Sequence, residues 1–128
     1  RAYTNGVVNK RILQYLGIIE AKKGNYEKAI NYWKEALMKF GKDTELLYNI
    51  AFAYHNLGKY KEAINYYLEV EKINDQEASL LINLGYLYFQ LKDYQNAYIR
   101  YEKFLKRYPS HSLSGEIEKK LNIIKSLK

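Results

Sequence analysis

The stretch Gly58-Lys59-Tyr60-Lys61-Glu62-Ala63-Ile64-Asn65-Tyr66-Tyr67 decides the fold of this chain, because it recurs. Related stretches begin thirty-four residues upstream, at Gly24, and thirty-four residues downstream, at Lys92. A period of this size indicates stacked copies of one supersecondary unit. We therefore divide the chain into a lead-in at 1–9, repeats at 10–43, 44–77 and 78–111, and a final segment at 112–128.

Each repeat is predicted to form two helices. In the second repeat, apolar residues from Leu46 to Tyr54 recur at intervals of three and four, which is the spacing of one helical face. Gly58 then interrupts the pattern and can adopt the positive φ common at helix ends. A second apolar stripe runs from Tyr60 to Val70. Because the connection is short, the two helices are expected to lie antiparallel.

Two positions of the second helix predict how the pair packs. A small residue that permits close approach of the helices is followed, four residues later, by a large ring that fills the adjacent groove. The small residues are Ala29, Ala63 and Ala97, and the rings are Trp33, Tyr67 and Tyr101.

The spacing and identity of these residues match a known repeat pattern. It resembles the tetratricopeptide repeat, which reads Trp-x-x-Leu-Gly-x-x-Tyr, then Ala-x-x-x-Phe, then Pro, over 34 residues. The third repeat matches at Leu84, Gly85, Tyr88, Ala97, Tyr101 and Pro109. The resemblance implies an all-α, right-handed superhelix of about seven helices, made of three antiparallel pairs and a capping helix.

At two positions the sequence departs from this pattern, and each departure predicts a local difference in structure. Glu20 replaces the tyrosine of the first helix, so we expect either looser packing of the first repeat there or a carboxylate paired with a nearby lysine or tyrosine hydroxyl. Asp75 replaces the closing proline, so we expect a less rigid turn there.

The two ends of the chain also have predicted structures. Thr4 or Asn5 is expected to cap the first helix, and Ser112 or Ser114 to cap the last one. The last helix presents Ile117, Leu121, Ile124 and Leu127 on one side and lysines on the other, as a terminal cap requires. Because the chain begins Arg1-Ala2-Tyr3 rather than with Met, we read it as a domain of a larger protein.

Residue types for catalysis are scarce. The chain has two histidines, no cysteine and isolated glycines, so no metal-ligand spacing and no phosphate-binding fingerprint appears. We expect no enzymatic activity, no cofactor and no metal site. No apolar run of about 18 residues is present, so no membrane insertion by this segment is expected.

The resemblance locates a candidate binding site. In tetratricopeptide folds the first helix of each repeat lines a concave groove. Matching positions hold Tyr15 and Ile18, then Tyr48, Asn49, Phe52 and His55, then Ile82, Asn83, Tyr86 and Phe89. This wall is aromatic and aliphatic with amides between, which favours binding of an apolar or aromatic peptide or helix, from another protein or from another region of the parent protein.

A chaperone's acidic C-terminal tail is not the expected partner. The carboxylate clamp of such family members requires Lys and Asn, then Asn, then Lys and Arg at set positions. This sequence has Gln14, Ile18, Asn49, Ser79 and Asn83 there, so only Asn49 matches.

Two alternative functions remain open from the sequence. The net charge of +7 suggests electrostatic binding of nucleic acid through a lysine-rich surface as one alternative, although no nucleic-acid-binding motif accompanies it. The N-terminal end of the domain has no capping helix comparable to the last one, which suggests self-association through that end as the other alternative. The stretch from Tyr101 to Ser110 resembles helix ends of bacterial envelope members, which favours the envelope over the cytoplasm and leaves the compartment open.

Overall fold

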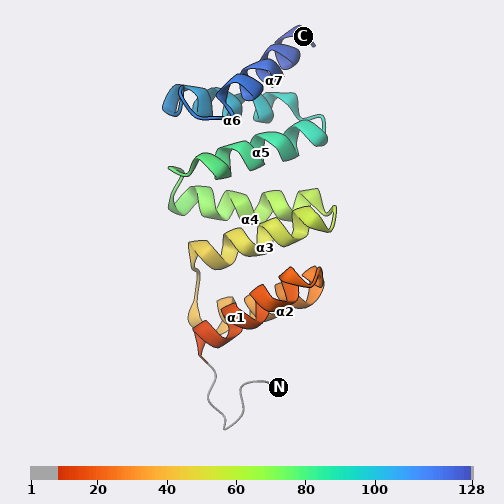
Figure 1. Ribbon diagram of the computed structural model, residues 1–128, viewed down its shortest axis with the longest axis vertical. Coiled ribbons are helices and arrows are strands. Elements are labelled where there is room, and N and C mark those ends of the chain that lie inside the picture. The colour runs from red at the N-terminus through yellow and green to blue at the C-terminus, as the bar shows by residue number, and fades with distance from the viewer. Residues whose placement is uncertain (1–8, 128) are drawn as a thin grey trace. The chain divides into compact units, whose positions relative to one another are not determined.

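The computed structural model describes residues 9–127, which form seven α-helices and no strand in that range (Figure 1). The predicted all-α fold class is confirmed. The helices are α1 (Lys10–Lys22), α2 (Tyr26–Phe40), α3 (Thr44–Asn56), α4 (Tyr60–Ile73), α5 (Ala78–Gln90), α6 (Tyr94–Arg107) and α7 (Ser114–Ser126).

The chain divides into two compact units, with the boundary between Ile73 and Asn74. The first unit contains α1 to α4, in which α1 packs against α2, α2 against α3, and α3 against α4. The second unit contains α5 to α7, where α6 packs against both of the others. Each unit has its own core of apolar side chains. Leu13 in the first core and Leu81 in the second are fully excluded from solvent.

Aromatic rings of the second helix in a pair pack where the first helix has no side chain. A Cβ atom added at Gly85 would lie 2.3 Å from the Tyr101 ring, and one added at Gly17 would lie 2.1 Å from the Trp33 ring. Both rings are buried. The alanines and the rings predicted for the second helices are buried, and at Gly17 and Gly85 a glycine of the first helix lets the ring reach the opposing backbone.

The first and last helices begin differently from expectation. Asn9 caps α1, accepting a hydrogen bond from the Ile12 amide at 2.9 Å, and the predicted caps Thr4 and Asn5 lie outside the described residues. Neither predicted serine caps α7, whose N-cap residue is Leu113. Ser114 instead lies within the first turn, where its buried hydroxyl donates to the Tyr108 carbonyl at 2.6 Å. That bond satisfies a carbonyl left over at the end of α6.

The turn at Asp75, for which the sequence predicts less rigidity, is linked to α6 by side-chain contacts. The Arg107 guanidinium donates to the Asp75 carbonyl oxygen at 2.6 Å and to its carboxylate at 3.2 Å, and Lys103 lies 3.8 Å from that carboxylate. The hydrogen bond from Arg107 lowers the pKa of Asp75. The Tyr108 hydroxyl also donates to the Gln76 carbonyl. Side chains from the end of α6 thus contact this turn where a proline is expected.

Glu20 has a different partner from the lysine or tyrosine hydroxyl predicted for it. Its carboxylate accepts a hydrogen bond from the Asn25 amide at 2.9 Å rather than from a lysine or a tyrosine hydroxyl. Asn25 lies five residues later, in the turn between α1 and α2, so a local partner satisfies this carboxylate.

The turn inside each helix pair requires a left-handed residue at the same position of the period. Gly24 and Gly58 have φ of 85° and 78° there, whereas Lys92 adopts φ of 63° in the third repeat. An L-residue with a side chain is strained in this region, and glycine is not. The third hairpin therefore carries strain that the first two avoid.

Substitution of Gly85 tests the ring packing. Gly85→Ala should lower the free energy of unfolding by about 1–3 kcal/mol, because the buried Tyr101 ring must move to admit the methyl group. Gly115→Ala is the matched control: its Cβ would meet nothing within 4 Å, and alanine should stabilise α7 by up to about 1 kcal/mol. Urea unfolding measures both. Equal stability of the two variants would contradict the packing.

Substitution of Lys92 tests the turn. Lys92→Gly should raise the free energy of unfolding by about 0.5–1 kcal/mol, since glycine relieves the left-handed strain. Lys92→Ala keeps the strain while removing the side chain, so thermal unfolding should show no gain for it. A gain of similar size for both variants would attribute the effect to the lysine side chain instead.

Candidate protein-binding groove

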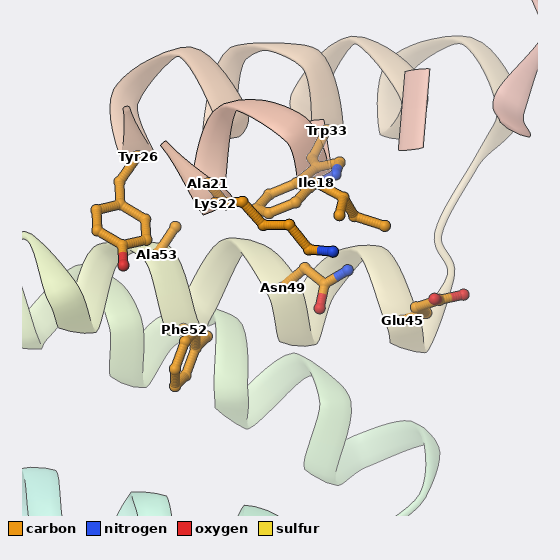
Figure 2. Close-up of a pocket in the computed structure, with 9 residues that line it drawn as sticks. All are labelled: Ile18, Ala21, Lys22, Tyr26, Trp33, Glu45, Asn49, Phe52 and Ala53. Atoms are coloured by element: carbon orange, nitrogen blue, oxygen red, sulfur yellow. The ribbon is translucent and has the colours of Figure 1, made fainter. Parts of the chain in front are cut away.

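A pocket of about 380 Å³ lies between α1 and α3 in the first unit. Its lining comes from three helices, as Figure 2 shows. They contribute Ile18, Ala21 and Lys22 from α1, Tyr26 and Trp33 from α2, and Glu45, Asn49, Phe52 and Ala53 from α3. Such a concave, largely apolar site with a few polar groups is typical of ligand binding.

The Trp33 ring forms the inner wall of this pocket. It is buried and occupies the space beside Gly17, and its indole N–H donates to the Gln14 carbonyl at 3.2 Å. The hydrogen bond satisfies the one polar atom of the ring and fixes its orientation. The pocket therefore has a rigid apolar wall.

Polar groups lie at the open side of the pocket. In Figure 2 the Lys22 side chain extends toward Asn49, and Glu45 lies at one end of the opening. Glu45 accepts a hydrogen bond from the Gln14 amide at 3.5 Å. One ammonium, one amide and one carboxylate can thus meet the backbone or side chains of a bound segment.

The structure brings three of the predicted binding residues together at this pocket. Ile18 from α1 and Asn49 and Phe52 from α3 line it, and the Phe52 side chain is 49% exposed. In Figure 2 the Phe52 ring points away from Trp33, so it forms the outer edge of the pocket. Tyr15 is 67% exposed on α1 but does not line the pocket.

The other two predicted residues of the first unit pack within the fold. The Tyr48 ring meets the buried Tyr67 ring edge to face, with centroids 5.2 Å apart. The His55 ring contacts Phe52 and Tyr60 edge to face at 6.4 Å and 5.7 Å. Tyr48 thus joins the α3–α4 packing, and His55 packs against the rings of Phe52 and Tyr60.

Helix α7 contacts two of the predicted residues of the second unit, Tyr86 and Phe89. Ile82 and Phe89 pack against a core cluster that includes residues of α7. The Lys120 ammonium lies 5.5 Å from the Phe89 ring centroid and 6.0 Å from that of Tyr86. Asn83 lies half-buried on the same helix, α5. The face of α5 predicted to bind a partner therefore carries a basic residue from the capping helix.

The ten residues predicted for the groove do not include Tyr26 and Trp33, two aromatic residues that line the pocket. Both lie on the second helix of the repeat, which was assigned only to the scaffold. The signal available was the glycine at position 17, because a missing side chain there lets a large ring pass through to the groove.

Comparison with known proteins identifies the family. Two family models described as tetratricopeptide repeat match residues 20–81 and 80–111. The chain belongs to the tetratricopeptide repeat family. No curated protein matches the sequence at a significant level.

Solved structures of tetratricopeptide repeat proteins share the fold. The TPR domain of Arabidopsis OM64 is 20% identical, with a TM-score of 0.77 over 88% of this chain and 93% of that one. A tetratricopeptide repeat protein from Parabacteroides merdae is 25% identical, with a TM-score of 0.85 over 98% of this chain and 49% of that one. The first TPR of Spaghetti (RPAP3), bound to an HSP90 peptide, is 23% identical, with a TM-score of 0.77 over 92% and 91%.

Further features of the described residues bear on function. Within residues 9–127, no helix is long and apolar enough to cross a membrane. No group of three or more metal-ligating side chains is found in the same range. The tetratricopeptide repeat fold supports a protein-interaction scaffold, and members of this family are generally non-enzymatic.

Protonation of His55 should weaken the fold at low pH. Burial lowers the pKa of His55, so the folded state binds this proton less readily than the unfolded state does. The free energy of unfolding should therefore be constant well above pH 6.5 and fall as the pH drops below that value. Thermal unfolding of the wild type and of His55→Gln between pH 7.5 and 5 measures the effect. Equal slopes for the two proteins would exclude His55 as the cause.

Proposed function

We propose that this domain is a protein-interaction scaffold that binds an apolar or aromatic segment of a partner protein in the groove between α1 and α3. The observation that carries the proposal is the pocket of about 380 Å³ with the Trp33 ring as its wall. Its volume is in the range of known ligand pockets and suits the insertion of a large aliphatic or aromatic side chain.

The surroundings of the pocket suit a peptide backbone. Asn49 offers both an amide donor and an amide acceptor beside the apolar wall, and the half-exposed Phe52 ring provides an aromatic contact at the outer edge. Aromatic anchors commonly contribute most of the binding energy at such interfaces. Asn49 would then fix the register of a segment whose anchor side chain fills the pocket.

The pocket differs from a site for an acidic chain end. The two clamp positions of α1 hold Gln14 and Ile18, and Gln14 is already hydrogen-bonded to Glu45. The HSP90 peptide SRMEEVD bound to the first TPR of Spaghetti illustrates a peptide ligand of that protein. For the present chain we propose a ligand recognised by its apolar side chains. The comparisons support neither nucleic-acid binding nor self-association.

A displayed library of random peptides tests the proposal. Selection on the immobilised domain should enrich peptides with a large apolar or aromatic residue, and Phe52→Ser should weaken their binding at least about tenfold, as expected for a hot-spot residue. Ile99→Ser is the matched control, because Ile99 is 43% exposed on α6 and lies outside the pocket. Isothermal titration calorimetry gives the dissociation constants.

Two results would contradict this function. One is equal binding of the selected peptides by Phe52→Ser, Ile99→Ser and the wild type. The other is tight binding of the acidic peptide SRMEEVD with no enrichment of apolar peptides, which would indicate a site for chain ends. Circular dichroism of both variants establishes that a loss of binding does not come from unfolding.

A further inference from the structure

The front face of α1, away from the pocket, carries an apolar stripe. Ile12, Leu16 and Ile19 lie along it at helical spacing, and the Ile19 side chain is 41% exposed. One period later, the equivalent residues of α3 are at most 1% exposed, because α2 packs against them. They are Leu46, Ile50 and Ala53. Within residues 9–73, α1 packs extensively only against α2, so no other helix of the first unit covers its stripe.

A polar pocket adjoins this stripe. It has a volume of about 320 Å³ and is lined by Glu20, Lys28, Asn31, Tyr32 and Glu35, and the Glu35 carboxylate is paired with the Lys39 ammonium at 3.1 Å. The Glu20 carboxylate accepts its hydrogen bond from a neutral amide and forms no ion pair within residues 9–127. A carboxylate held in place without a counter-ion among the described residues favours the approach of a cation.

The second repeat shows what occupies the equivalent place. Tyr54 and Tyr66 stand one period after Glu20 and Tyr32, and their rings stack with centroids 5.7 Å apart. Lys34 reaches them from α2, with its ammonium 5.3 Å and 6.0 Å from the two ring centroids. In the second repeat, this position therefore receives a cation from the preceding helix. In the first repeat, the same position contains the Glu20 carboxylate, which attracts a cation more strongly than an aromatic ring does.

We propose that the front face of α1 docks an amphipathic helix of a partner protein, whose apolar stripe covers Ile12, Leu16 and Ile19 and whose Lys or Arg binds Glu20. The chemistry of that helix follows from α2, which places Ile30 and Leu37 in the core shared with α3 and Lys34 over the tyrosines. This surface is separate from the α1–α3 pocket, so it can be tested without reference to the proposed peptide groove.

A peptide with the sequence of residues 25–41 is the probe, stapled between positions 27 and 31 to hold it helical. It offers the apolar and basic pattern that α2 presents. Titration into the isotope-labelled domain should shift the backbone NMR signals of Ile12, Leu16 and Ile19. Glu20→Lys should weaken binding at least about tenfold, and a peptide with glutamate at the Lys34 position should bind that variant better than the original peptide does.

The matched control is Glu118→Lys, which makes the same charge change at an exposed position of α7. It should leave the affinity unchanged, which separates a contact at Glu20 from the effect of net charge. The Glu20→Lys domain is also titrated with the peptide that carries glutamate at the Lys34 position. Recovered affinity in this titration indicates a direct ion pair, because a variant that does not fold cannot regain affinity.

Three results would overturn the proposal. Shifts confined to Ile18, Asn49 and Phe52 would assign the peptide to the groove. A doubling of mass in light scattering of the domain alone, abolished by Glu20→Lys, would make a second copy the occupant. Binding that occurs only after removal of residues 1–8 would show that the chain's own first residues cover this face.

Discussion

The structure depends on an aromatic ring that packs directly against backbone. In the first and third helix pairs, Trp33 and Tyr101 occupy the space in which a side chain at Gly17 or Gly85 would stand. Burying such a ring stabilises the pair through its large apolar area and fixes the distance between the two helices. Because interiors are packed as closely as crystals, this one contact leaves little freedom for the rest of the hairpin.

The candidate binding site follows from the same contact. Since Gly17 leaves room for the indole, the Trp33 ring extends to the pocket between α1 and α3 and forms its wall. The residues around it are supplied by helix faces that the hairpin packing orients, including Asn49 and Phe52. A rigid scaffold thus presents an apolar cavity beside an amide and a half-exposed ring, and this combination suits recognition of another protein rather than catalysis.

The sequence predicts the fold well because periodicity is a local and repeated signal. Apolar spacing identifies both helices of each pair, and Gly58 takes the positive φ expected of it. Single hydrogen bonds are predicted less well, since Ser112 and Ser114 are equally good caps in sequence and only the placement of α6 draws Ser114 to the Tyr108 carbonyl. The contact of Lys120 with Tyr86 and Phe89 could not be predicted from the repeat. Lys120 follows the last full repeat, so no equivalent residue in an earlier repeat indicates its position.

Fluorescence of Trp33, the only tryptophan of the chain, tests the central claim most directly. A segment that enters the pocket must contact this ring, so titration with a library-selected peptide should change the emission of Trp33 saturably. The dissociation constant should agree with the one from calorimetry. Calorimetric binding without any change in Trp33 emission would place the ligand elsewhere and contradict the account.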